Sequence, residues 1–204
     1  MIQRLKLKPL LAFALLAMAF AGSARAELTI EITRGSDNPV PIAIVPFGWP
    51  QGGSVPPEDV ASIIEADLKL SGEFAPMPRE NMLGMPESST DVFYRDWRSL
   101  GMDYLLVGKL EVRGRGVRAQ YELLDANTQQ VILTGSETAK LDDIRGVAHA
   151  VSDAVYEKLT NVRGAFSTKL LYVSARRNQR NQFRYSLLTS DIDGARERVI
   201  LDQS

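Results

Sequence analysis

The amino-acid sequence predicts an α+β fold, in which a mixed sheet is packed by two main helices and is followed by the first strands of an incomplete β-propeller. Three observations predict this. Strand-like and helix-like periodicities alternate between residues 27 and 162. Residues 104–133 contain three strand patterns separated by short turns, which is typical of an antiparallel meander. Residues 163–204 contain three more short strands, too few to bury a core alone.

The composition excludes several classes of function. The chain has 204 residues, of which 45% are hydrophobic and 24% are charged, as expected of a folding chain. It contains no cysteine, which excludes disulfides, thiolate metal sites and a cysteine nucleophile. The single histidine disfavours a histidine-based zinc site and a serine-type triad. A formal net charge of −1 gives no support to nucleic-acid binding.

Residues 1–26 have the pattern of a signal peptide. Arg4, Lys6 and Lys8 precede an apolar run at residues 10–21, which is too short to span a bilayer as a helix. Residues 24–26 (Ala-Arg-Ala) have the small residues of a cleavage site, so we expect cleavage between Ala26 and Glu27. A membrane anchor is disfavoured because no second hydrophobic span follows. We therefore expect an exported chain without a membrane span after cleavage.

Two strands are predicted before the first helix. Leu28, Ile30 and Ile32 alternate with polar residues, which indicates a half-buried strand. Residues 35–39 interrupt it with Gly, Ser, Asp, Asn and Pro. Residues 42–45 are a continuous apolar run, as expected of a strand covered on both faces.

A helix is predicted after a loop rich in Pro and Gly. Glu58 and Asp59 suit the positive end of the helix dipole, and Gly72 is the expected stop. Apolar residues recur between them at helical spacing: Val60, Ile63, Ile64 and Leu68. A short strand over residues 74–77 and a short helix over 91–100 follow.

The meander and a long helix complete the first part. Alternate residues of the meander share one face of each strand: Tyr104, Leu106, Leu110 and Val112; Val117, Ala119, Tyr121 and Leu123; Val131 and Leu133. The final helix is expected over residues 141–159, with an apolar stripe of Ile144, Ala148, Val151, Val155 and Leu159. We expect one α+β domain at residues 27–162, with helices 58–71 and 141–159 on one face of the sheet.

Residues 163–204 are predicted to begin a β-propeller domain. Strands are expected at residues 170–174, 183–188 and 199–201, with a polar loop at 175–182 and a turn at 190–194. They resemble one truncated propeller blade, so we expect the chain to stop partway through a larger protein.

Neither a catalytic residue nor a metal site is predicted, and no cofactor is expected. Asp191 and Asp193 resemble the middle of an EF-hand loop, but Thr189 and Ile200 stand where its end ligands would be. A hairpin turn explains the two aspartates better. His149 lies one residue beyond the apolar stripe, so we expect a surface or boundary hydrogen-bonding residue in preference to a catalytic base.

Two interpretations of the N-terminal strand stay open. Its amphipathic pattern and the flexible linker after it suit a segment that adds to the sheet edge of another protein. The same backbone groups could equally pair within the sheet of the chain itself.

Several segments together resemble the TolB family, a periplasmic component of the Tol-Pal cell-envelope system of Gram-negative bacteria. The resemblance rests on residues 41–47, 148–160 and 162–166, and on the blade pattern from 171–174 through 190–194. It covers essentially all of residues 27–204, and the junction between helix and blade is its most specific part. The family has a six-bladed propeller, of which only the opening is present here.

The resemblance implies a binding protein and not an enzyme. In that family the propeller binds the outer-membrane lipoprotein Pal, and the mature N-terminus binds the inner-membrane protein TolA. The system supports outer-membrane invagination during cell division and outer-membrane integrity. The TolA-binding residues implied here are Glu27, Leu28, Thr29, Ile30, Glu31, Ile32, Thr33, Arg34, Gly35, Ser36, Asp37 and Asn38.

Two other classes of exported protein are alternatives. One is a peptidase with an N-terminal propeller, whose catalytic domain would lie beyond residue 204. The other is a solute-binding protein, which needs two lobes and a cleft that the chain hardly provides.

Overall fold

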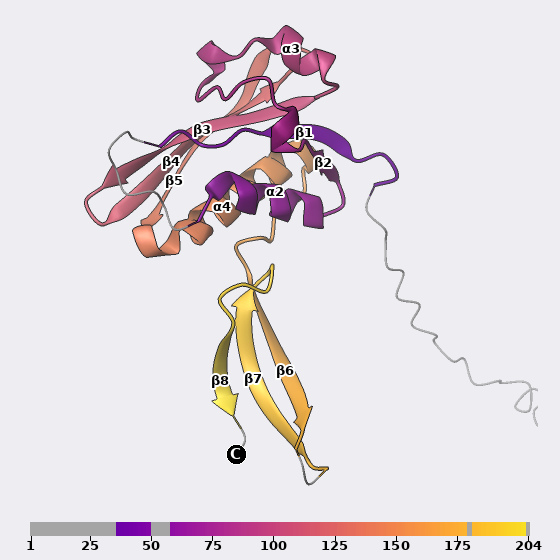
Figure 1. The fold of residues 1–204 in the computed structure, drawn as a ribbon, viewed down its shortest axis with the longest axis vertical. Helices are drawn as coiled ribbons and strands as arrows, with labels where there is room; N and C mark the ends of the chain where they lie inside the picture. The colour runs from indigo at the N-terminus through magenta and orange to yellow at the C-terminus, as the bar shows by residue number, and fades with distance from the viewer. Residues whose placement is uncertain (1–35, 50–57, 179–180, 203–204) are drawn as a thin grey trace, which may run out of the picture. The chain divides into compact units, whose positions relative to one another are not determined.

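The computed structural model describes residues 36–49, 58–178 and 181–202 (Figure 1). These residues all belong to one compact unit, residues 34–204. None of the helices among them is both long and apolar enough to cross a membrane.

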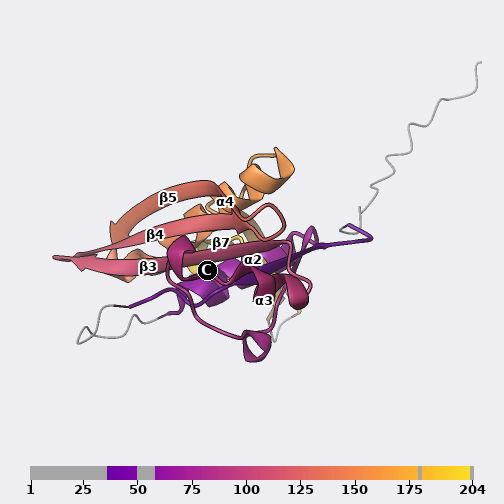
Figure 2. The ribbon, with the colours of Figure 1, turned by 90° about the horizontal axis from the view of Figure 1, so that it is seen from above.

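The first sheet has five strands in the order β2-β1-β3-β4-β5. Its strands are β1 (Val40–Ile44), β2 (Phe74–Pro76), β3 (Tyr104–Arg113), β4 (Gly116–Asp125) and β5 (Gln130–Lys140). β1 pairs in parallel with β2 and β3, whereas β3, β4 and β5 form the predicted antiparallel meander. Figure 2 shows these three long strands side by side. The sheet is therefore mixed, as predicted.

Helices cover one face of this sheet. α2 (Val60–Leu70) and α4 (Ile144–Thr160) share a core with Ile42 and Ile44 of β1. Figure 1 shows α2 and α4 on one side of the sheet and α3 (Tyr94–Ser99) on the other. α2 begins after Asp59, whose Oδ1 accepts a hydrogen bond of 3.0 Å from the backbone N–H of Ala61. The packing of two main helices on one face is confirmed.

The opposite face of the sheet has its own smaller core. Ala43 and Val45 pack there against Met77, Val92 and Trp97. Successive side chains of this apolar run point alternately into the two cores. The run therefore lies between two layers. The sequence did not predict that residues 77–102 supply this second layer.

Several boundaries differ from those predicted. The helix expected over residues 91–100 is shorter, since a 3-10 turn, η2 (Ser89–Asp91), precedes α3. Another 3-10 turn, η3 (Leu141–Asp143), stands where the last helix was expected to begin. A third, η1 (Arg79–Asn81), was not expected. The strand predicted at residues 28–33 lies outside the described residues.

The second sheet contains β6 (Lys169–Arg177), β7 (Phe183–Asp191) and β8 (Arg198–Asp202), in that order. All neighbours are antiparallel, as expected of the first strands of a propeller blade. The predicted polar loop starts later than expected, because Arg177 still pairs with Phe183. Apolar side chains of this sheet are exposed, such as Leu171 at 65% and Val173 at 62%. The predicted fold class is confirmed.

Replacing Gly135 by Ala should destabilise the first sheet. Gly135 of β5 lies opposite Tyr121 of β4, and an added Cβ would collide with the buried Tyr121 ring. We expect the free energy of unfolding to fall by about 1–3 kcal/mol, the usual effect of overpacking. Urea denaturation measures this. The control is Gly84→Ala, where an added Cβ meets nothing within 4 Å. Equal stability of the two variants would contradict the prediction.

Candidate functional site

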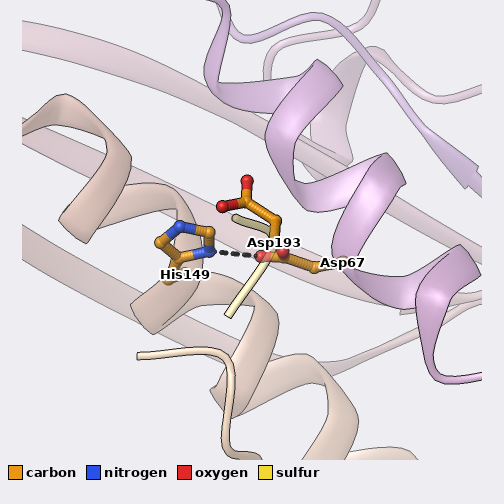
Figure 3. Close-up of side chains that lie close together, drawn as sticks. All are labelled: Asp67, His149 and Asp193. Atoms are coloured by element: carbon orange, nitrogen blue, oxygen red, sulfur yellow. Dashed lines mark hydrogen bonds and ion pairs between the residues drawn. The ribbon is translucent and has the colours of Figure 1, made fainter. Parts of the chain in front are cut away.

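Ionisable side chains gather where α2 and α4 meet the turn between β7 and β8. Figure 3 shows three of them: Asp67 from α2, His149 from α4 and Asp193 from the turn. Asp67 is completely buried and His149 is 2% exposed. We call this group, together with the charged and polar residues that contact it, the junction cluster. Its members are Glu58, Asp67, Asp143, Arg145, His149, Ser152, Lys169, Asp191, Asp193 and Arg196.

Helical spacing brings the α4 members together. Arg145, His149 and Ser152 are separated by four and three residues, so they share one face of the helix. The expectation that His149 lies at the surface or boundary is wrong, because α2 packs over this face and supplies a buried carboxylate. The polar stripe of Arg145, His149 and Ser152 beside the apolar stripe is the signal that could have indicated such a site.

The carboxyl group of Asp67 is held by two side chains of α4. Its Oδ2 lies 2.8 Å from His149 Nδ1 and accepts a hydrogen bond of 2.7 Å from the Ser152 hydroxyl. Its Oδ1 and the His149 Nε2 have no hydrogen-bond partner in the part of the chain that the structure describes. Across the junction, the Asp191 Oδ2 lies 3.8 Å from Nε2.

Asp191, the last residue of β7, is paired with several cations. Its carboxylate accepts hydrogen bonds from Lys169 of β6 and from Arg196, the latter at 2.6 Å. Arg145 Nε lies 3.5 Å from its Oδ2. Burial alone would raise the pKa of Asp191, but the hydrogen bonds from Arg196 and Lys169 outweigh burial and lower it to about 2. Asp191 is therefore ionised at neutral pH.

Arg145 joins the turn to both helices. Its guanidinium lies on α4 and pairs with Glu58, just before α2, and with Asp193 of the turn. Burial would lower the pKa of Arg145, but the bonds to Glu58 and Asp193 raise it. Arg196 similarly pairs with Asp143, which precedes α4. The turn is thus attached to the helical layer by several ion pairs.

The connection between α4 and β6 is also fixed. Asp153 of α4 accepts hydrogen bonds from the backbone N–H groups of Phe166 at 2.6 Å and Ser167 at 3.1 Å. The buried Phe166 ring packs edge-on against Tyr156, with 5.7 Å between centroids. Gly164 runs so close to Asp153 that a Cβ would lie 2.5 Å from its Cα. The two sheets are therefore connected by a packed segment.

The junction cluster does not have the geometry of a hydrolase. A serine-type triad needs the serine hydroxyl beside the imidazole, whereas the Ser152 hydroxyl donates to Asp67 and to the Ala148 carbonyl. Ligand atoms of Asp67, His149 and Asp193 lie within 4.8 Å of one another, a spacing compatible with a metal ion. Arg145, however, already pairs with Asp193 and brings a fixed positive charge to the same place. The arrangement suits a charged structural contact between helices and turn.

The predicted site residues fall in two groups. The cleavage site, Ala26 and Glu27, and residues 27–35 of the TolA-binding segment lie outside the described residues. Ser36, Asp37 and Asn38 are described and exposed, just before β1. Asp191 and Asp193 do belong to a hairpin turn, as predicted, with Gly194 at φ +83°. Their contacts with the helices were not predicted.

Comparison with known proteins identifies relatives of the chain. The sequence model of the TolB amino-terminal domain matches residues 28–132. The Tol-Pal system protein TolB of Pseudomonas fluorescens is 48% identical over 182 residues, which cover 89% of this chain and 42% of the relative. The Pseudomonas aeruginosa protein of the same name is 46% identical over 193 residues, covering 94% and 44%. The chain therefore spans less than half the length of these curated relatives.

A solved structure has the same fold. The crystal structure of TolB from Acinetobacter baumannii matches with a TM-score of 0.70 and 31% sequence identity. The match covers 85% of this chain and 41% of that one.

Replacing Asp191 by Asn should weaken the junction cluster in a pH-dependent way. A carboxylate whose pKa is lowered by folding stabilises the protein fully when the pH is above the pKa that the group has in the unfolded chain, which is 3.8 for Asp191. That contribution is lost as the pH falls toward the pKa in the folded protein, about 2. We expect Asp191→Asn to lose about 2 kcal/mol of unfolding free energy at pH 7.

Urea denaturation at pH 7 and at steps from pH 4 to 2 measures the difference between the two proteins. The wild-type advantage should shrink over the acidic range. The exposed Asp37 is the matched control, and Asp37→Asn should match the wild type. A difference between wild type and Asp191→Asn that stays constant from pH 7 to 2 would count against the proposed pairing.

Proposed function

The chain belongs to the TolB family, and from this premise we propose that it is a periplasmic, protein-binding component of the Tol-Pal cell-envelope system. In this proposal it links the inner-membrane protein TolA to the outer-membrane lipoprotein Pal. The observation that carries the proposal is the family match over residues 28–132, together with curated relatives that bear the name Tol-Pal system protein TolB. The process served would be outer-membrane invagination during division and outer-membrane integrity.

We assign TolA binding to residues 27–38. Leu28, Ile30 and Ile32 give this segment one apolar face, as expected of a strand that adds to the edge of a partner sheet. β1 itself is unsuitable for such pairing, because β2 and β3 already occupy both of its edges. Ser36, Asp37 and Asn38, at the end of this segment, are exposed and precede β1, so they would be accessible to a partner.

The proposal also divides the chain into functional parts. Residues 1–26 would direct export, 27–162 would form the N-terminal domain, and 163–204 would begin the propeller. Pal would bind mainly to propeller blades other than the strands present here. The junction cluster supports a coupling between the two partners, since its ion pairs connect the first sheet's helices to the β7–β8 turn. The proposed role is binding, without a reaction.

Deleting residues 27–38 should abolish binding to the C-terminal domain of TolA. The described strands and helices all follow this segment, so the deletion should leave the fold intact. Calorimetric titration measures the binding, and circular dichroism checks the fold. Undiminished binding by the folded deletion variant would contradict the assignment.

A pair of matched variants tests which face of the segment binds. Ile30→Asp with Ile32→Asp places two charges on the apolar face, and Thr29→Asp with Thr33→Asp places the same charges on the opposite face. We expect the first pair to abolish binding and the second to retain most of it. Equal losses would show that the apolar face has no special part in binding.

A further inference from the structure

An apolar groove lies on the outer layer of the first sheet, the side that carries α3 and faces away from α2 and α4 (Figure 1). The loop before η2 and the start of α3 form it, and it encloses about 330 Å³. Its lining combines the buried Trp97 with three exposed apolar side chains, those of Leu83, Met85 and Phe93. We call this feature the α3 groove.

The exposure of these side chains is unusual. Phe93 at 77% and Leu83 at 67% are the two most exposed large apolar side chains among the described residues, and both line the same groove. Single exposed apolar residues are common on protein surfaces, whereas a group of them around one hollow is typical of a binding surface. Met85 adds a flexible side chain that can adapt to the shape of a partner.

The α3 groove is fixed by the packing beneath it. Val92 and Trp97, which flank Phe93 in the sequence, are buried in the smaller core of the sheet. The preceding loop is tied to β4, because the backbone N–H of Ser89 donates a hydrogen bond of 2.7 Å to Glu122. A partner would therefore meet a surface that is already formed, which lowers the entropic cost of binding.

The charged side chains that line the α3 groove are both acidic, Asp91 and Asp96. Asp91 accepts a hydrogen bond of 2.8 Å from the Ser88 hydroxyl, and no cation among the described residues pairs with it. Asp96 pairs with Arg95 at 3.3 Å, but the Arg95 side chain is 88% exposed, so this pair is weak and can be exchanged. The surface is complementary to apolar side chains accompanied by Lys or Arg.

The position of the α3 groove favours a helical partner. Its lining residues belong to the connection between β2 and α3 and to α3 itself, so a strand edge does not contribute to it. An extended segment bound there would gain no backbone pairing from a sheet. An α-helix satisfies its own backbone groups and can use its apolar side chains as anchors.

We propose that the α3 groove binds an amphipathic helix of a partner protein. Apolar side chains of this helix pack against Leu83, Phe93 and Trp97, and its Lys or Arg side chains pair with Asp91 and Asp96. The groove contains no residue of the segment 27–38 or of the propeller strands. It is therefore a further binding surface, additional to those under the proposed function and independent of them.

Fluorescence anisotropy with synthetic peptides tests the chemistry of the partner. The probe is a labelled peptide of Leu and Lys whose Leu residues recur at helical spacing. One control has the same composition in strict alternation, and another has Glu in place of Lys. We expect both controls to bind at least about tenfold more weakly than the probe. No binding of the probe, or equal binding of the three peptides, would overturn the proposal.

Substitution of the apolar lining tests the location. Leu83→Ser with Phe93→Ser should weaken binding of the helical Leu/Lys peptide at least about tenfold, because it removes the apolar anchors. Leu70→Ser with Val162→Ser is the matched control, since these two side chains are similarly exposed at 62% and 57% and lie outside the groove. Circular dichroism checks the fold. Equal losses in the two variants would place the binding elsewhere.

A second pair of variants tests the charges. Asp91→Asn with Asp96→Asn should weaken the same peptide, whereas Asp37→Asn with Glu157→Gln removes as much charge from exposed positions outside the groove and should not. Equal effects would show attraction to the net charge of the protein alone and would overturn the assignment of the two aspartates.

NMR of the indole N–H groups locates the binding in the unmodified protein. The sequence has two tryptophans: Trp97 lines the groove, and Trp49 packs against the core on the other face of the sheet. The helical Leu/Lys peptide should shift the Trp97 signal and leave that of Trp49 in place. An unmoved Trp97 signal at saturation would contradict the proposal. So would self-association without peptide that Leu83→Ser abolishes, since the groove would then be a contact between copies of the chain.

Discussion

The structure depends on the burial of a carboxyl group, that of Asp67, between two helices. α2 and α4 pack over one face of the mixed sheet, and a buried carboxyl group at their contact must be matched by hydrogen-bonding side chains. Ser152 and His149 provide these from α4. Beside this contact, the β7–β8 turn is joined to the helical layer by the ion pairs Arg145–Asp193 and Arg196–Asp143.

This arrangement connects two parts of the molecule that could otherwise be independent. The second sheet exposes apolar side chains and is too small to be stable by its own burial. Ion pairs of Arg145 with Asp193 and of Arg196 with Asp143 hold its turn, and Asp153 fixes the segment that enters β6 by accepting hydrogen bonds from it. A partner that displaced the turn would disturb α2 and α4 directly. In a protein proposed to bind two partners, such a contact gives a physical basis for coupling between them.

Local patterns in the sequence predicted most of the fold. The apolar run at residues 42–45 indicated a strand covered on both faces, and the stripe of Ile144, Ala148 and Val151 indicated the long helix. Contacts between distant residues could not be predicted in this way. His149 and Asp67 are 82 residues apart, so the apolar periodicity of α4 does not indicate that the Asp67 carboxyl group contacts the histidine. Likewise, the cover of the second face comes from residues 77–102, whose helix has only six residues and a weak pattern.

The central claim is that ion pairs between the helices and the turn hold the two sheets together. A double-mutant cycle on Arg145 and Asp193 tests it most directly, because these residues pair across the junction. Unfolding free energies of Arg145→Gln, Asp193→Asn and the double variant give the coupling energy. We expect a favourable coupling of about 1–3 kcal/mol. Effects that add to within about 0.3 kcal/mol would show that the pair contributes nothing and would contradict the claim.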